Sequence, residues 1–300
     1  MRLLALRNRL GGSRRQPPPP EVAPPWPPPV AVEPDGVAAE GAWGRERLRL
    51  AEALWGEGFL LPGGADEVLR LAVPLGLSAA SSLLLLGVGS GGPTLRLAGD
   101  LGVWVRGYES DPFLAAMAAR RIQRAGVALA KRATVERWDP EHPGFGRRAF
   151  HHALTVEALA TARPEDVLAA LAQAVRPGGQ IALLETVAPT PPDPADPAVA
   201  GWLRLEPQGG LLPDPARIGR TLERLGFEVR VAEDISARHM RQVVGGWRRL
   251  LRDLKADRPD VAHAVPLVAE AELWLRRVRL MRAGRLRRMR WLAVDRGTTG

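Results

Sequence analysis

Residues 83–98 read Leu-Leu-Leu-Leu-Gly-Val-Gly-Ser-Gly-Gly-Pro-Thr-Leu-Arg-Leu-Ala, and this stretch decides the fold of the chain. Four apolar residues run into a glycine-rich segment, and apolar residues at helical spacing follow it. This pattern predicts a buried parallel strand, a tight turn and a helix. Gly87 and Gly89 allow the backbone to approach a ligand closely, whereas Gly91 and Gly92 leave room for the helix to pack on the strand. The stretch therefore predicts a nucleotide-binding turn.

An acidic residue at the end of the next expected strand strengthens this prediction. Residues 102–109 read Gly-Val-Trp-Val-Arg-Gly-Tyr-Glu, a short strand that ends in Glu109. A carboxylate about 20 residues after the glycines can accept hydrogen bonds from both ribose hydroxyls of a nucleotide. The spacing leaves dinucleotide-dependent enzymes open, although the turn here is G-x-G-x-G-G rather than G-x-G-x-x-G.

The composition is that of a globular protein with an unusual source of positive charge. The formal net charge of +9 on its own favours nucleic acid or an anionic membrane surface as a partner. Lys131 and Lys255 are the only lysines, however, so the charge is almost entirely arginine, as is typical of a GC-biased genome. We therefore expect no nucleic-acid partner, and only weak peripheral contact with an anionic membrane.

Two absences narrow the classes of protein further. The chain has no cysteine, which excludes disulfides, thiolate metal sites and cysteine nucleophiles. No apolar run approaches the ~18 residues of a membrane span. A cytoplasmic location is the default expectation for such a chain.

Helical and strand patterns alternate along the chain from about residue 41. This alternation predicts an α/β fold: a Rossmann-like, open and mostly parallel seven-stranded sheet with flanking helices, a helical N-terminal lid and a helical insertion before the last strand. The expected strands are residues 83–86, 102–109, 133–137, 149–156, 180–187, 227–231 and 289–294. The expected helices are residues 43–54, 65–75, 93 onward, 111–124, 164–175, 215–225 and a long region over 236–281.

Two segments outside this alternation have their own signatures. Residues 1–40 are basic and proline-rich, which predicts a disordered tail ahead of one globular domain over residues 41–300. Residues 55–64, between the first two helices, are rich in glycine and contain Trp55 and Phe59. They form either a lid beside the ligand or a helix connection fixed by the two buried aromatic residues.

Five motifs, in order and spacing, resemble those of class I S-adenosylmethionine-dependent methyltransferases. They are Leu86-Gly-Val-Gly-Ser-Gly-Gly-Pro93, Gly107-Tyr-Glu-Ser-Asp-Pro112, Trp138-Asp-Pro140, Arg176-Pro-Gly-Gly-Gln180 and Leu225-Gly-Phe-Glu-Val229. Within that class, Trp55-Gly-Glu-Gly-Phe-Leu-Leu-Pro-Gly-Gly64 is similar to the small-molecule branch, which includes phosphoethanolamine and sarcosine/dimethylglycine N-methyltransferases. The segment Glu233-Asp-Ile-Ser236, followed by Trp247, is similar to that branch too. The resemblance covers roughly residues 42–296.

The resemblance implies S-adenosylmethionine as the cofactor and assigns roles to several residues. Glu109 would bind the ribose and Ser110 would lie beside the adenine, which Trp138 and Asp139 would flank. From the residues alone, Asp139 is equally explained as the cap of a turn. The remaining implied contacts are the glycine turn at the methionine end, with Gly87, Gly89, Ser90 and Gly91, and the methyl-transfer mouth from Thr155 to Glu157.

The sequence departs from the pattern of the class at two positions. Leu85 stands where an acid usually precedes the first glycine by two residues, and His151 stands where an acid is common at the start of the fourth strand. A catalytically silent relative that binds S-adenosylmethionine therefore remains an alternative to an active enzyme.

Methyl transfer from a sulfonium needs alignment and exclusion of water more than it needs a protein nucleophile. For a small-molecule acceptor, most simply an amine, Glu157 is the candidate to hold the nitrogen and take its proton. A purely structural carboxylate is the other interpretation of Glu157. We expect no metal site, because His151 and His152 are adjacent on a strand and point to opposite faces.

The basic segment before the last strand gives the third alternative. A series of arginines runs from Arg276 to Arg290. It forms either a solvated face or, if the side chains converge, a surface that binds anions or phospholipids.

Overall fold

The computed structural model describes residues 43–206, 212–256 and 261–297 of the chain. The predicted disordered tail, residues 1–40, lies outside the described residues. No helix within the described ranges is long and apolar enough to cross a membrane.

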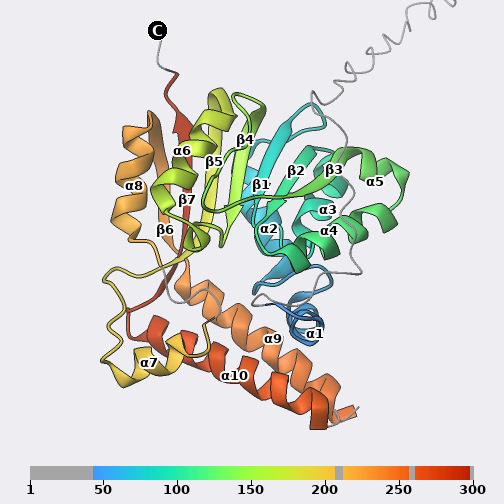
Figure 1. The fold of residues 1–300 in the computed structure, drawn as a ribbon, viewed down its shortest axis with the longest axis vertical. Helices are drawn as coiled ribbons and strands as arrows, with labels where there is room; N and C mark the ends of the chain where they lie inside the picture. Colours follow the sequence, from blue (N-terminus) through green and yellow to red (C-terminus); the bar gives the residue numbers. More distant parts are fainter. Residues whose placement is uncertain (1–42, 207–211, 257–260, 298–300) are drawn as a thin grey trace, which may run out of the picture.

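A seven-stranded sheet forms the centre of the protein, in the order β3-β2-β1-β4-β5-β7-β6 (Figure 1). β7 runs antiparallel to both of its neighbours, whereas β1 to β5 pair in parallel. The predicted Rossmann-like, mostly parallel sheet is therefore confirmed. The strands are β1 (Ser82–Leu86), β2 (Trp104–Glu109), β3 (Ala133–Arg137), β4 (Phe150–Val156), β5 (Val175–Val187), β6 (Phe227–Asp234) and β7 (Arg287–Asp295).

Helices cover both faces of the sheet. The α-helices are α1 (Arg45–Trp55), α2 (Gly64–Ala72), α3 (Gly92–Leu101), α4 (Pro112–Arg124), α5 (Val127–Arg132), α6 (Pro164–Ala174), α7 (Pro197–Leu203), α8 (Pro215–Arg224), α9 (Ser236–Ala256) and α10 (Val261–Arg282). Two short 3₁₀ helices, η1 (Val73–Leu75) and η2 (Leu159–Thr161), complete the elements.

The leucine run of β1 shows how the sheet is buried on both sides. Leu84 and Leu86 join a core cluster with α6 and α8, whereas Leu83 and Leu85 join another cluster with α2, α3 and α4. Alternate residues of a strand point to opposite faces, so a strand covered on both sides needs apolar residues throughout. This is why four consecutive leucines suit β1.

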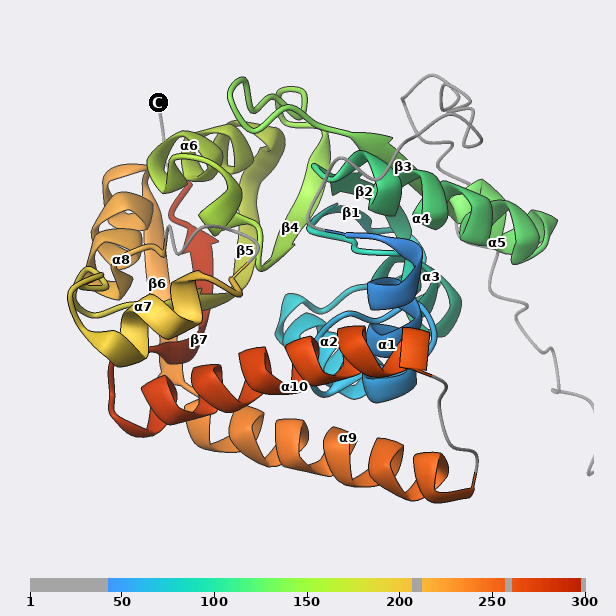
Figure 2. The ribbon, with the colours of Figure 1, turned by 60° about the horizontal axis from the view of Figure 1, so that its bottom comes forward.

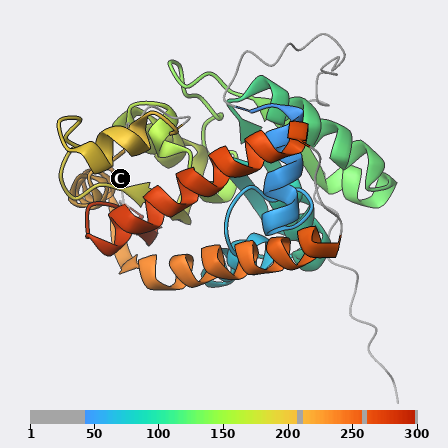
Figure 3. The ribbon, with the colours of Figure 1, turned by 90° about the horizontal axis from the view of Figure 1, so that it is seen from below.

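A third layer lies across the carboxyl ends of the strands. Helices α1, α9 and α10 pack together there around Trp55, Trp274 and Val243, and α7 packs on α10 (Figures 1, 2 and 3). Helix α1 is the predicted N-terminal lid, and α9 and α10 are the predicted insertion before the last strand. They enclose the edge of the sheet at which the glycine turn lies.

Three local features differ from the sequence expectation. The helical region expected over residues 236–281 consists of two helices, α9 and α10, that run side by side (Figure 3). Strand β5 begins at Val175 instead of residue 180. The helices α5 and α7 were not predicted, although α7 begins with the same Asp-Pro signal that starts α4 and α8: the side chain of Asp196 accepts a hydrogen bond from the amide of Ala198.

Candidate functional site

A cavity of about 390 Å³ lies between the carboxyl ends of β1, β2 and β4 and the helices α1 and α10. Its volume falls within the roughly 300–1,000 Å³ of small-molecule sites. One wall is formed by the glycine turn after β1, and the opposite wall comes from α1, α10 and the segment after α7. The cavity therefore occupies the position where ligands bind in open parallel α/β sheets, beyond the carboxyl ends of the strands.

The glycine turn forms a close-packed floor. Gly87 has φ +80°, and a Cβ on it would lie 2.1 Å from the carbonyl oxygen of Val156. Gly89 has φ +57°, and a Cβ there would lie 2.8 Å from a methyl of Leu60. Gly87 and Gly89 both line the cavity. A side chain at either residue would be strained and would fill space next to the cavity.

Two other predicted residues of this turn face away from the cavity. Gly91 packs against α4, where its Cβ would lie 3.0 Å from the Cα of Ala118. Ser90 is fully buried and donates a hydrogen bond of 2.9 Å from Oγ to Glu52 on α1. These two residues shape the turn and attach it to the lid.

Glu109 ends β2 and lines the cavity beside the turn. Its carboxylate accepts hydrogen bonds from the amides of Gly89 at 2.7 Å, Ser110 at 3.0 Å and Asp111 at 3.2 Å. Burial raises the pKa of Glu109 to about 7 in spite of these donors. The structure thus brings the predicted acid into direct contact with the predicted turn, and Ser110 lines the cavity next to it.

Trp138 and Asp139, which follow β3, lie in different environments. Trp138 is buried and lines the cavity, and its backbone amide donates a hydrogen bond of 3.2 Å to the carbonyl of Glu109. Asp139 is not part of the cavity wall: its carboxylate accepts hydrogen bonds from His142 at 2.9 Å and from the amide of Glu141 at 3.0 Å. Asp139 thus has the geometry of the turn cap that was its alternative interpretation.

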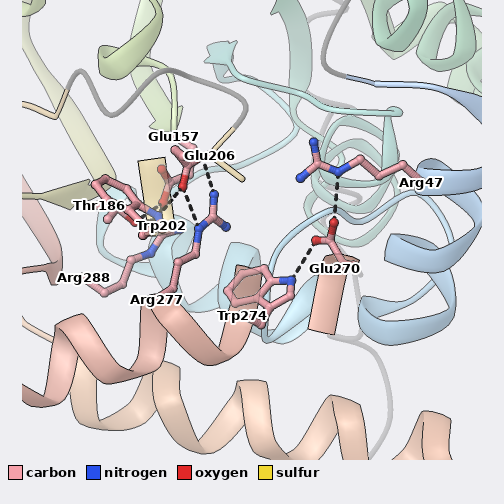
Figure 4. Close-up of polar contacts among 9 residues, drawn as sticks. All are labelled: Arg47, Glu157, Thr186, Trp202, Glu206, Glu270, Trp274, Arg277 and Arg288. Atoms are coloured by element: carbon pink, nitrogen blue, oxygen red, sulfur yellow. Dashed lines mark hydrogen bonds and ion pairs between the residues drawn. The ribbon is translucent and has the colours of Figure 1, made fainter. Parts of the chain in front are cut away.

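The two polar residues of the predicted methyl-transfer mouth, Thr155 and Glu157, also lie in different environments. Glu157 lines the cavity at an unusual backbone φ of +54°, and its Oε1 accepts a hydrogen bond of 2.7 Å from Thr186. The guanidinium of Arg288, a fully buried residue of β7, pairs with the same oxygen (Figure 4). Thr155 points away from the cavity and donates to Glu185 at 2.7 Å.

Glu185, which the sequence analysis missed, anchors the loop that carries Glu157. It is fully buried in β5 and accepts hydrogen bonds from Thr155, from the amide of Ala158 at 3.2 Å and from the amide of Leu159 at 3.3 Å. Burial raises its pKa to about 7. An isolated glutamate late in an apolar strand carries no sequence signal for this role.

The raised pKa of Glu185 predicts a pH dependence of stability. The folded protein binds this proton more tightly than the unfolded chain, so the contribution to stability is complete below about pH 4.5 and is lost as the pH rises through about 7. From pH 5 to pH 8, the free energy of unfolding of the wild type should fall by about 2 kcal/mol more than that of Glu185→Gln. Urea unfolding at several pH values measures this, with the exposed Glu223→Gln as the control. Parallel profiles for Glu185→Gln and wild type would contradict it.

The two positions that depart from the class pattern lie outside the cavity. Leu85 is fully buried in the sheet core. His151 lies near the amino end of β4, where its Nδ1 accepts a hydrogen bond of 2.9 Å from the amide of Ser82. Within the described ranges, no group of three or more histidine and acidic side chains is arranged to bind a metal.

The opposite wall of the cavity contains charged residues to which the sequence analysis gave no role in the cofactor or acceptor site. Glu270 accepts hydrogen bonds from Arg47 at 3.1 Å and from the indole of Trp274 at 2.9 Å. Glu206 accepts two from Arg277, at 3.0 and 2.7 Å (Figure 4). These residues come from α1, α10 and the segment after α7, which lie more than 200 residues apart at the extremes, so only the folded chain brings them together.

A histidine of α9 lies behind the cavity wall. His239 is buried, and its ring lies 5.9 Å from that of Trp274. Burial lowers its pKa to about 3, so it is a neutral core residue behind the cavity wall.

The lid is attached to the glycine turn by Glu52 of α1. Its Oε1 accepts hydrogen bonds from the amide of Gly58 at 3.0 Å, from Ser90 at 2.9 Å and from Arg121 at 2.6 Å. The amide of Gly92 also donates to the carbonyl of Gly58 at 3.0 Å. The segment 55–64 is therefore a fixed connection that also covers the cavity, which combines the two interpretations left open by the sequence.

Comparison with known proteins shows which solved structures share this fold. No protein-family model matches the sequence, and no curated protein is significantly similar to it. Among solved structures, phosphoethanolamine N-methyltransferase 2 of Haemonchus contortus in complex with S-adenosyl-L-methionine matches 83% of this chain with a TM-score of 0.71 and 17% identity. A putative sarcosine dimethylglycine methyltransferase from Galdieria sulphuraria matches 83% of this chain and 98% of its own, with a TM-score of 0.68 and 15% identity. This chain has the methyltransferase fold.

Two facts limit what the shared fold implies. The chain covers only 56% of the length of the Haemonchus contortus protein. The [4+2]-cyclase SpnF also matches, with a TM-score of 0.63, 20% identity and coverage of 83% of this chain and 93% of its own. A fold that carries different reactions does not decide the chemistry, so the function is argued from the site.

Proposed function

We propose that this protein binds S-adenosylmethionine and transfers its methyl group to a small-molecule acceptor, an amine. The observation that supports this most directly is the pairing of Glu109 with the glycine turn on one wall of the cavity. A carboxylate at the end of β2, 2.7 Å from the amide of Gly89, is placed to accept hydrogen bonds from ribose hydroxyls beside the glycine-rich turn.

The residues present fit this cofactor. Gly87 and Gly89 leave the floor of the cavity open, Glu109 supplies the acceptor for the ribose, and Ser110 and Trp138 form the wall for the base. The acid usual at residue 85 is missing, so the methionine end would rely on the turn backbone and the lid. When bound, the cofactor supplies an electrophilic methyl group on a sulfonium.

The chain itself contributes alignment, exclusion of water and a proton acceptor. Apolar residues that line the cavity, among them Phe59, Leu60 and Val156, keep water from the reacting atoms. An amine that took up this methyl group would have to give up a proton to become neutral again. We assign the acceptance of that proton to Glu157, which Thr186 and Arg288 hold in place.

The two other hypotheses have less support from the structure. A catalytically silent relative would share the cofactor site, and its specific arguments are Leu85 and His151, both of which lie outside the cavity. A basic surface for anions requires the late arginines to converge. Most of them instead pair with acids. Among the residues that the structure describes, ion pairs are formed by Arg276, Arg277, Arg285, Arg287, Arg288 and Arg290, which leaves Arg279 and Arg282 of the series.

We expect Glu109→Ala to weaken binding of S-adenosylmethionine by about 1.5–3 kcal/mol, the scale of hydrogen bonds to a charged group. Because the pKa of Glu109 is raised to about 7, wild-type affinity should also rise about tenfold from pH 6 to pH 8, as the carboxylate becomes ionised. Isothermal calorimetry measures both effects.

Asp139→Asn is the matched control, because Asp139 lies outside the cavity wall and should leave the affinity unchanged. Unchanged affinity in Glu109→Ala would remove Glu109 from the site. Binding without methyl transfer across a broad acceptor panel would favour the silent relative.

A further inference from the structure

The acceptor end of the cavity is lined by four glutamates, and each is paired with an arginine. The pairs are Glu67 with Arg238, Glu157 with Arg288, Glu206 with Arg277, and Glu270 with Arg47. Figure 4 shows the last three of these pairs around Trp274. We call this set the four-pair wall.

The pair between Glu206 and Arg277 is fixed on both sides. Arg277 donates through Nε at 3.0 Å and Nη2 at 2.7 Å to the two oxygens of Glu206, and its guanidinium lies 4.8 Å from the ring centre of Trp274. The indole of Trp202 donates a third hydrogen bond to Glu206 at 2.8 Å. A two-point ion pair of this kind is both strong and geometrically specific. The positive charge of Arg277 is therefore matched inside the protein.

The pair between Glu270 and Arg47 joins the lid to α10. Arg47 donates to Oε2 of Glu270 at 3.1 Å, and the indole of Trp274 donates to Oε1 at 2.9 Å. The guanidinium of Arg47 also lies 4.5 Å from the ring centre of Trp43. The carboxylate and the guanidinium both line the cavity.

The remaining two pairs keep their arginines behind the wall. Glu67 accepts hydrogen bonds from Arg238 at 2.8 Å and from Gln242 at 2.9 Å, and these bonds hold the pKa of Glu67 below its ordinary value against the opposing effect of burial. Glu157 is held by the buried Arg288. In both pairs the glutamate lines the cavity and the arginine does not.

The charges at this wall balance. Within the part of the chain that the structure describes, Arg47 and Arg277 are the cationic residues that line the cavity, and a lining glutamate neutralises each one. The other lining acids, Glu109 and Asp111, lie on the cofactor side. A phosphate group carries about −1.5 to −2 charges at pH 7. It would have to displace a buried glutamate from its arginine and leave that carboxylate without its partner, which is costly.

We propose that the acceptor is an amine that carries no phosphate or carboxylate group, and that Glu206 and Glu270 enforce this selection by occupying Arg277 and Arg47. This inference rests on the proposed function for the identity of the reaction, but the charge balance itself is a property of the empty protein. It can therefore be tested without cofactor.

The decisive experiment measures phosphoethanolamine binding to the full chain by calorimetry in the absence of cofactor. Wild type should show no binding up to millimolar concentrations. Glu206→Gln removes one negative charge, keeps the shape of the side chain and leaves the guanidinium of Arg277 uncompensated, so its affinity for phosphoethanolamine should be at least tenfold higher. Ethanolamine, which differs only by the phosphate, should show no such gain.

The double variant Glu206→Gln/Arg277→Gln is the matched control, because it removes the cation as well and should lose the gain. Glu270→Gln, which removes the carboxylate that pairs with Arg47, provides a second test if Glu206→Gln does not fold. Submillimolar phosphoethanolamine binding by wild type would overturn the proposal, and so would an unchanged affinity in the folded glutamine variants. If the wild type did not bind S-adenosylmethionine in a separate titration, that result would count against the proposed function but not against the charge balance at the four-pair wall.

Discussion

Replacing Arg288 with leucine is expected to lower the free energy of unfolding by about 3–5 kcal/mol, the cost of removing one partner of a buried ion pair. Arg288 is 1% exposed, pairs with Glu157 and donates a hydrogen bond of 3.2 Å from Nη1 to Thr186. Burial lowers its pKa to about 9, so it stays charged at neutral pH. Leucine would leave the carboxylate of Glu157 at the cavity wall without its counter-ion. Chemical denaturation of both proteins measures the difference.

The neighbouring residue supplies the control for this prediction. Arg287 is exposed and its guanidinium lies 3.7 Å from Asp234, so Arg287→Leu should change stability by less than about 1 kcal/mol. The double variant Arg288→Leu/Glu157→Leu removes both charges and should recover much of the stability lost in Arg288→Leu. If Arg288→Leu were as stable as wild type, the pair would not be buried as the structure describes it.

The sheet was predictable from the sequence because its strands carry strong local signals. Runs of apolar residues located all seven strands, and the glycines and Asp-Pro pairs between them marked where strands end and helices begin. These patterns involve residues that are close in the sequence, so they can be recognised without the folded structure. The helix α7 was missed although Asp196 and Pro197 carry the same start signal as Asp111 and Pro112. This helix has only seven residues and lies in a proline-rich segment, and both features favour the prediction of a loop.

The site was predictable on one wall only. Gly87, Gly89 and Glu109 lie within two adjacent strand ends, where the motif spacing of a parallel α/β unit determines their proximity. The four-pair wall joins residues of α1, α2, α9, α10 and strand β7 across most of the chain. Because the glutamate and the arginine of each pair lie far apart in the sequence, no local spacing pattern indicates that they will pair. Arginine is also so common in this chain that no single one stands out. Contacts of this kind become visible only in the folded structure.

The second large effect is expected at the glycine turn. Gly87→Ala should lower the free energy of unfolding by about 3 kcal/mol or more and abolish S-adenosylmethionine binding. Alanine at φ +80° costs about 1–2 kcal/mol in backbone strain alone. Its Cβ would also lie 2.1 Å from the carbonyl oxygen of Val156, so β1 and β4 must separate at the point where they meet the cavity. Thermal unfolding and calorimetric titration with the cofactor measure the two effects.

A glycine with similar backbone geometry but open surroundings separates strain from collision. Gly284 has φ +72°, and a Cβ there would meet nothing within 4 Å, so Gly284→Ala should cost only the strain and leave cofactor binding intact. The difference between the two variants measures the contact with Val156. If both variants lost the same stability and Gly87→Ala still bound the cofactor at wild-type affinity, the turn after β1 would have room for a side chain. It could not then be the tight floor on which the proposed cofactor site depends.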